Sequence, residues 1–172
     1  MNNTVYFDEY KQSIKRIRDS EKSSYTLKLL FANVITLMEV YLSKAIISTV
    51  KGDKDLIIKI TESKLFNSHK ITLKTALTNN MEQYILGQLN HTIFHNLNDV
   101  FILYRDVFGI KFRQDRQIID SIKRRHHIVH RNGLDFEGNS VEISENDLEN
   151  VIKIVTSFLS NIDMQLCKIL DH

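Results

Sequence analysis

The sequence predicts an all-α fold, a helical bundle with one small β-hairpin, and three observations support this prediction. The 172 residues include no proline and five glycines, which are too few chain-reversing residues for an all-β or loop-rich fold. Apolar side chains recur every three or four positions through most of the chain, which is the period of an amphipathic helix. Apolar residues make up 42% of the chain and charged residues 26%, proportions typical of a soluble globular domain.

This periodicity places the helices along the chain. They are expected at 5–19, 25–50, 54–63, 71–77, 81–89, 93–108, 114–131 and from 145 onward. The segment 25–50 is apolar around most of its circumference, so we expect it at the centre of the bundle. The β-branched residues of 54–63 leave a strand possible there. Although eight segments show this pattern, we expect about five to seven helices in all, forming a single domain over residues 1–172.

Local signals mark where several of these helices begin and end. Ser23 or Ser24 is a suitable N-cap for the helix at 25–50, because a serine oxygen can accept from a free backbone N–H of the first turn. Gly109 is expected to end the helix at 93–108. Asp115 or Asp120 is expected to begin or line the helix at 114–131. Ser144 is expected to cap the last helix, with Asp147 as its partner in an arrangement like a capping box.

The segment between the last two helices, Leu134 to Ser144, alternates apolar and polar residues on each side of Gly138-Asn139. Such alternation around a glycine turn predicts a small β-hairpin or an extended tongue.

Several classes of protein are disfavoured by composition. The single cysteine, Cys167, excludes an intramolecular disulfide and indicates a reducing compartment, and we expect it to be a buried, inert thiol. The first ten residues contain no apolar segment of the kind found in signal peptides. The longest apolar run, 29–50, is interrupted by Asn33, Glu39 and Lys44, so we interpret it as a core helix and expect a cytoplasmic protein without a membrane partner.

Charge is distributed unevenly along the chain. Residues 105–131 hold eight Lys and Arg against three Asp and Glu, a net charge of +5, whereas residues 134–172 hold two against eight, a net charge of −6. The two segments can pair with each other in the fold. The basic segment can also attract a polyanion such as a nucleic acid.

The functional site is predicted at 122–133, where basic residues and three histidines lie close together in the sequence. This stretch ends at Asn132-Gly133, a signal that ends a helix. An α-helix advances about 100° per residue. Arg125 therefore falls in the apolar stripe of Ile118, Ile122 and Val129. An arginine at such a position needs hydrogen-bond or ion-pair partners, or a solvent-filled cleft. On the opposite arc, which is expected to be solvated, lie Arg116, Lys123, Arg124, His127 and Arg131.

This stretch resembles a known family. Arg125-His126-x-x-x-His130 is similar to the R-x(4–6)-H signature of HEPN domains, and the phrase Arg-Arg-His-His-Ile-Val-His-Arg-Asn-Gly resembles HEPN proteins of the RiboL-PSP and MAE_28990 types. Within 25–50, Leu-Met-Glu-Val-Tyr-Leu resembles the family's early helix. The resemblance implies a metal-independent endoribonuclease without a cofactor, acting as a homodimer whose two motifs form one cleft. It also implies a toxin–antitoxin or phage-defence setting, with an antitoxin or defence-system partner.

Each residue of the motif has an expected role. In a ribonuclease of this kind His130 would be the general base and Arg125 would bind the phosphate, because imidazole titrates near neutrality and guanidinium stays charged. His126 would orient the substrate or protonate the leaving 5′-oxygen. The RNA backbone would be held by Lys123, Arg124 and Arg131. Side chains five positions apart on a helix point about 140° away from each other, so we expect a second subunit to complete the site.

Other interpretations of the same residues remain open. His126, His127 and His130 have spacings that can bind zinc, and so do His91 and His95, although the latter are expected to be satisfied surface histidines. A non-catalytic HEPN module that binds nucleic acid or protein, or a purely structural basic helix end, would also fit. Glu39 could be an exposed or internally hydrogen-bonded residue, or a carboxylate that orients the basic motif.

Overall fold

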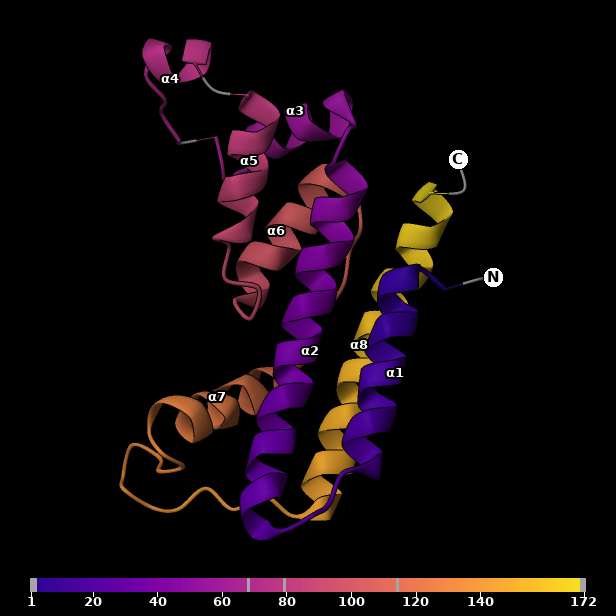
Figure 1. The fold of residues 1–172 in the computed structure, drawn as a ribbon, viewed down its shortest axis with the longest axis vertical. Helices are drawn as coiled ribbons and strands as arrows, with labels where there is room; N and C mark the ends of the chain where they lie inside the picture. Colours follow the sequence, from indigo (N-terminus) through magenta and orange to yellow (C-terminus); the bar gives the residue numbers. More distant parts are fainter. Residues whose placement is uncertain (1–2, 68, 79, 114, 171–172) are drawn as a thin grey trace. The chain divides into compact units, whose positions relative to one another are not determined.

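A computed structural model describes residues 3–67, 69–78, 80–113 and 115–170, and within these ranges it contains eight α-helices, one isolated β-bridge and no sheet. The predicted all-α fold is confirmed, with more helices than the five to seven expected (Figure 1). The helices are α1 (Val5–Asp19), α2 (Ser24–Val50), α3 (Lys54–Glu62), α4 (Leu73–Thr78), α5 (Met81–Asn90), α6 (Leu97–Phe108), α7 (Arg116–His130) and α8 (Glu145–Leu170).

The residue contacts divide the chain into two compact units. One consists of Met1–Tyr41 with Arg113–Asp171, and the other of Leu42–Phe112. The first unit contains α1, the N-terminal part of α2, α7 and α8, so every residue of the predicted motif belongs to it. The second unit is an insertion in the sequence of the first.

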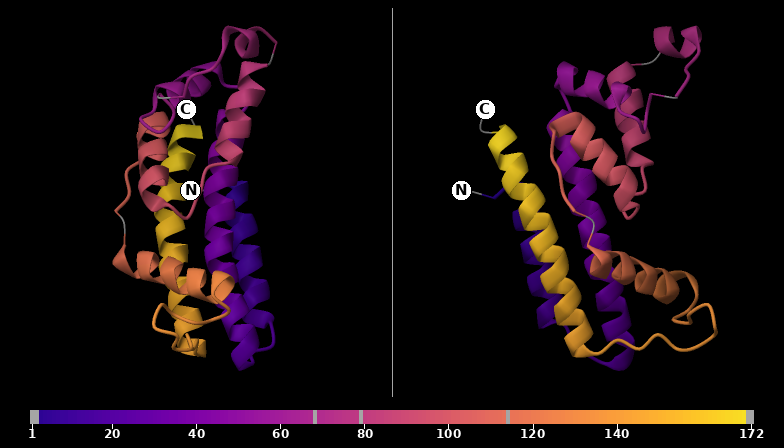
Figure 2. Two further views of the ribbon diagram at one scale, coloured as in Figure 1. Left: turned by 90° about the vertical axis from the view of Figure 1, so that its left-hand side faces the viewer. Right: turned by 180° about the vertical axis from the view of Figure 1, so that it is seen from behind.

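The first unit is built on two long amphipathic helices that lie side by side. α1 packs against α8, and α7 also contacts α8 (Figures 1 and 2). α1 buries Phe7, Tyr10, Ile14 and Ile17 along one face, at the spacing of three or four expected for this segment. From α2, Phe31, Val34, Ile35 and Met38 are almost fully buried. These residues form the core that supports the basic motif.

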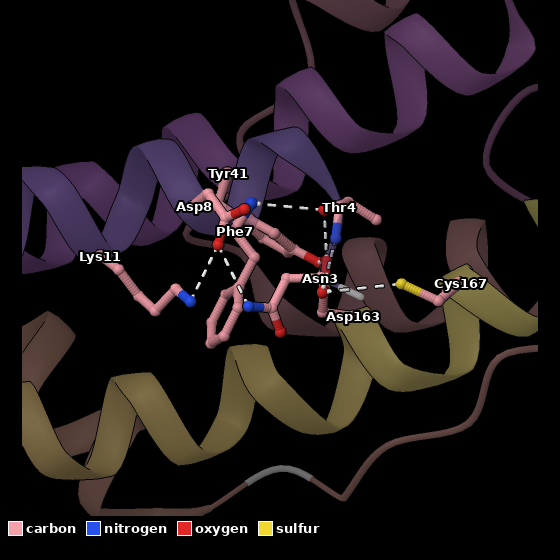
Figure 3. Close-up of polar contacts among 8 residues, drawn as sticks. All are labelled: Asn3, Thr4, Phe7, Asp8, Lys11, Tyr41, Asp163 and Cys167. Carbon is pink, nitrogen blue, oxygen red and sulfur yellow. Dashed lines mark hydrogen bonds and ion pairs between the residues drawn. The ribbon is translucent and has the colours of Figure 1, made fainter. Parts of the chain in front are cut away.

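A buried carboxylate joins three helices of the first unit (Figure 3). Asp163 of α8 is 2% exposed and accepts hydrogen bonds from the backbone N–H of Thr4 at 3.1 Å, from the Thr4 hydroxyl, and from the Tyr41 hydroxyl at 2.8 Å. Thr4 is also the N-cap of α1, and its hydroxyl accepts from the N–H of Phe7. Cys167 is buried, as expected, with its sulfur 3.8 Å from Asp163. Asp163 therefore fixes the start of α1 to α2 and α8.

The second unit holds the shorter helices. α3 packs against α5 and α6, and its helical state settles the ambiguity left by its β-branched residues. The predicted helix at 93–108 begins later than expected, at Leu97, because residues 91–96 form turns. His91 and His95 therefore lie before this helix. Gly109 ends α6 in the left-handed conformation, with φ +70°, as predicted.

Helix α2 is long and apolar enough to cross a membrane by length and composition alone, a test that the core helix of a soluble protein also passes. Half of its most apolar window is buried inside the structure.

Candidate functional site

Both ends of the motif helix α7 are fixed by residues that the sequence identifies. Asp115 caps its first turn by accepting from the N–H of Gln117 at 2.8 Å, which settles the choice between Asp115 and Asp120. At the other end, Asn132 and Gly133 both adopt positive φ, +53° and +78°, and the N–H of Gly133 donates to the carbonyl of His127. The chain therefore turns away immediately after His130.

The buried face of α7 differs from the predicted stripe. Val129 was placed beside Ile118, but it is 49% exposed, whereas Ser121 and Ile128 are buried. Ser121 tolerates this position because its hydroxyl donates to the carbonyl of Gln117, one turn earlier. The stripe is therefore rotated toward Arg124 and Arg125. Apolar spacing alone misplaced it, because one polar residue within the stripe satisfies its own hydrogen bond.

Arg125 lies at the edge of the core, as its position in the stripe predicted. Its side chain is 17% exposed, its Nη2 lies 4.0 Å from Glu39 Oε1, and its Nη1 lies 3.4 Å from His130 Nε2. Its buried Nε has no acceptor among the described residues. Although positions 125 and 130 point about 140° apart on the helix, the long arginine side chain brings its guanidinium into contact with His130 within one chain. Glu39 is a carboxylate beside the motif, and not an isolated edge residue.

Two more imidazoles lie next to this pair. The ring centroid of His126 is 4.9 Å from that of His130 and 6.2 Å from that of His127. Desolvation lowers the pKa of His126, and the nearby His130, His127, Arg125 and Arg131 lower it further, because a positive charge is disfavoured among cations. His126 and His130 are both exposed. The end of α7 therefore presents one guanidinium and two accessible imidazoles within contact distance.

Arg124 has a different environment from the one expected on a solvated arc. Its Nη1 donates to Asp147 at 2.8 Å, its Nη2 donates to the carbonyl of Glu142, and its guanidinium lies 5.1 Å from the Phe31 ring centroid. The same Asp147 completes the predicted capping box with Ser144. Arg124 therefore attaches α7 to the start of α8. The pair Arg124–Asp147 also joins the basic segment 105–131 to the acidic segment 134–172.

Lys123 and Arg131, the other two predicted RNA-binding cations, are exposed. Lys123 has an exposed partner one turn away, Asp120, at 3.3 Å. Arg131 Nη2 donates to the carbonyl of Asp135 at 3.2 Å, and its guanidinium lies over the ring of Phe136. Exposed pairs of this kind are weak and exchange readily, so both cations remain accessible to a polyanion.

The chain matches no family model, no curated protein and no solved structure.

The hairpin predicted after α7 is present as a short tongue with one antiparallel bridge, between Leu134 and Ser140 (the orange loop from α7 to α8 in Figure 2). Asp135 holds its turn, because its carboxylate accepts from the backbone N–H groups of Glu137 and Asn139. These hydrogen bonds, chiefly the one from Asn139, lower the pKa of Asp135.

The tongue contributes a residue that was assigned no role from the sequence. Phe136 is 76% exposed, and its ring centroid lies 4.8 Å from that of His127. The available signal was an apolar residue at the tip of a polar loop directly after the motif. Asp163 was missed as well, although it lies at helical spacing among apolar residues of α8 and could have been recognised by the argument applied to Arg125.

A metal site would need several His, Cys, Asp or Glu side chains close together. Within them, no three His, Cys, Asp or Glu side chains are grouped so that they could hold a metal, and His126, His127 and His130 form no such group.

A recess of about 840 Å³ lies between α1 and α8, and none of the described residues that line it belongs to α7. Two of its cations, Lys11 and Arg18, pair with Asp8 and Glu149. This recess is separate from the motif.

Proposed function

We propose that this chain is a metal-independent endoribonuclease of the HEPN type, with Arg125, His130 and His126 as its reacting groups. The observation that supports the proposal best is the contact of 3.4 Å between Arg125 Nη1 and His130 Nε2, beside the accessible ring of His126. A phosphate-binding guanidinium next to a general base is the minimum that such a reaction needs.

The reaction would begin at His130. Arginine can only donate a hydrogen bond, so its contact with His130 requires Nε2 to be unprotonated, which is the form a general base needs. When a phosphodiester binds, the guanidinium moves from the imidazole to the phosphate oxygens, with which it forms stronger, charge-assisted hydrogen bonds. The freed Nε2 takes the proton of the 2′-hydroxyl, and the 2′-oxygen attacks the adjacent phosphorus.

The bond from phosphorus to the 5′-oxygen then breaks, giving a 2′,3′-cyclic phosphate and a 5′-hydroxyl. The departing oxygen needs a proton, and His126 is the nearest remaining imidazole. Desolvation and the surrounding cations lower its pKa, which disfavours its imidazolium form in the free protein. Bound phosphate would raise this pKa again, because a negative charge stabilises the imidazolium. Glu39 limits the freedom of Arg125 and so positions it.

The exposed cations and a second subunit complete the proposal. Lys123 and Arg131 would hold the RNA backbone, whereas Arg124, already occupied by Asp147, would contribute mainly through the local field. A homodimer is proposed because Val129 and Leu134, 49% and 43% exposed, form apolar surface beside the motif. Its setting would be a toxin–antitoxin or phage-defence system, with an antitoxin or defence protein as partner.

The decisive experiment is cleavage of labelled RNA in EDTA by the wild type, His130→Ala and Arg125→Ala. We expect cleavage by the wild type only, and we expect the product ends to be a cyclic phosphate and a 5′-hydroxyl. The matched control is His91→Ala, which removes an exposed histidine of the second unit and should retain full activity.

The other outcomes separate the remaining interpretations. Full activity in either motif variant would remove that residue from the site. Activity that is lost in EDTA and restored by zinc would contradict the metal-free reaction. RNA or protein binding without cleavage would favour the non-catalytic HEPN module. For the dimer, light scattering should give twice the chain mass, and Val129→Glu should shift the protein toward monomer.

A further inference from the structure

We propose that Phe136, with Arg131 and His127, forms a stacking site for an unpaired nucleobase next to the reacting groups. This inference rests on the proposed function, since it names how the RNA is held there. It starts from an exposed aromatic side chain. Phe136 is 76% exposed, so a ligand can reach its ring.

The ring of Phe136 is held in place although it is exposed. The guanidinium carbon of Arg131 lies 4.7 Å from its centroid, and the ring of His127 meets it at an interplanar angle of 85°. The backbone below it is fixed by the Asp135 carboxylate, by the Leu134–Ser140 bridge and by the N–H of Val141, which donates to the carbonyl of Gly133 at 2.7 Å. A preorganised aromatic ring loses little further entropy when it binds.

The position of Phe136 connects it to the proposed reaction. Neighbouring ring centroids lie 4.8 Å apart from Phe136 to His127, 6.2 Å from His127 to His126, and 4.9 Å from His126 to His130. A continuous row of planar side chains therefore leads from the tongue to the general base. A nucleotide next to the one being cleaved can place its base on this row while its phosphate lies near Arg125.

The chemistry of the site favours single-stranded RNA over a duplex or a protein. Every base has a π-face, and stacking on an aromatic side chain is independent of sequence, whereas bases within a duplex already stack on each other. The neighbouring Arg131 adds a positive charge and a second planar group for the phosphate and the base. The tongue's carboxylate Asp135 is directed into the N–H groups of its own turn, which reduces its repulsion of RNA.

The test measures RNA binding in a His130→Ala background, so that cleavage does not interfere. The probe is a short single strand carrying 2-aminopurine, whose fluorescence is quenched by stacking, and affinity is read by anisotropy of a dye-labelled copy. Phe136→Ala should weaken binding roughly 5- to 100-fold and abolish the quenching. Phe136→Trp should restore both. Binding of the same sequence as a duplex should change less than twofold.

The matched control is Tyr25→Ala, which removes another exposed aromatic of the same unit, 71% exposed, and should leave affinity unchanged. Affinity within twofold of the parent in Phe136→Ala would overturn the proposal. Equal losses in Tyr25→Ala, or a loss of self-association with unchanged RNA affinity, would overturn it too, because Phe136 would then be general apolar or subunit-contact surface.

Failure of the ribonuclease proposal gives a different pattern of results. Phe136-dependent stacking with no cleavage by the otherwise unmodified chain supports the base site and rejects the ribonuclease. Cleavage by the wild type that Phe136→Ala leaves unchanged, together with unchanged binding, rejects the base site alone. Since Phe136 is exposed, Phe136→Ala should melt within a few degrees of its parent, which circular dichroism checks.

Discussion

The contact between Arg125 and His130 shows how much one side chain can change an inference made from a helical wheel. The wheel treats each residue as a direction from the helix axis, and the two directions differ by about 140°. Arginine has a long flexible stem, so its charged end can lie far from that direction. The wheel correctly placed Arg125 against the core. It could not show the position of the guanidinium group, on which the 3.4 Å contact with His130 depends.

At the same scale, the pKa of His126 reports on the charges around it. Desolvation and the surrounding cations, including Arg125, lower this pKa. Arg125→Gln removes one positive charge and should therefore raise the pKa of His126, which NMR titration of the imidazole protons measures. Lys168→Gln, a change at the far end of α8, is the control and should leave the titration unchanged. A pKa that falls or stays the same in Arg125→Gln would contradict the arrangement of this cluster.

Asp147 provides a second prediction for a single residue. Its hydrogen bond from Arg124, with those from Ser144, lowers its pKa from 3.8 to about 2. The carboxylate therefore adds stability above pH 3.8, and this contribution is lost as the pH falls towards 2. Because the side chain is one-third exposed, Asp147→Asn should cost only about 1 kcal/mol at neutral pH.

Urea denaturation at several pH values measures the effect of Asp147→Asn. Asp120→Asn is the matched control, because it breaks the exposed pair with Lys123 and should cost less than about 0.5 kcal/mol. Equal losses in the two variants would mean that Arg124 does not attach α7 to α8.

At the scale of the element, the helix ends were the most predictable features. Gly109, Gly133 and the Ser144–Asp147 pair were identified from the sequence and occupy the expected places. Ser23 and Asp115 were each one of two candidates, and the structure has both at the starts of their helices. Capping depends on a few neighbouring residues, so it can be recognised locally. The predicted start of α6 was wrong, because the chain forms turns before Leu97. The predicted buried face of α7 was wrong, because the Ser121 hydrogen bond lets a polar residue face the core.

Two glycines, one in the turn that ends α7 and one inside α5, give predictions of opposite sign. Gly133 has φ +78°, and a Cβ added there would meet no atom closer than 3.9 Å, so Gly133→Ala suffers backbone strain alone. We expect it to destabilise the protein by about 1 kcal/mol. Gly87 lies inside α5 with open space around it, so Gly87→Ala should stabilise by up to about 1 kcal/mol. Thermal melts should shift in opposite directions, and equal shifts would contradict the left-handed turn.

At the scale of the whole molecule, composition and periodicity predicted the all-α fold, because the absence of proline and the helical spacing hold throughout the chain. The sequence did not predict the division into two compact units. No linker marks their boundaries at 41/42 and 112/113, and the first boundary lies inside α2. The division follows from long-range contacts, which periodicity within one helix does not contain.

The Asp163 network should govern the stability of the first unit. Asp163→Ala leaves the N–H and hydroxyl of Thr4 and the hydroxyl of Tyr41 without this acceptor. We expect a loss of about 3 kcal/mol and faster amide exchange in α1. Asp163→Asn keeps one carbonyl acceptor and should lose less. Asn161→Ala, at an exposed neighbour on α8, should lose less than about 0.5 kcal/mol. Unchanged exchange of α1 in Asp163→Ala would show that the start of this helix is held by other contacts.

The same arrangement has a consequence for synthesis of the chain on the ribosome. α1 is translated long before its partner Asp163, and α7 also waits for α8. While the nascent chain is still attached to the ribosome, helices α3 to α6 of the second unit can already pack together. The first unit, which contains the motif helix α7, cannot yet assemble. The proposed ribonuclease would thus become active only after α8 had left the ribosome exit tunnel.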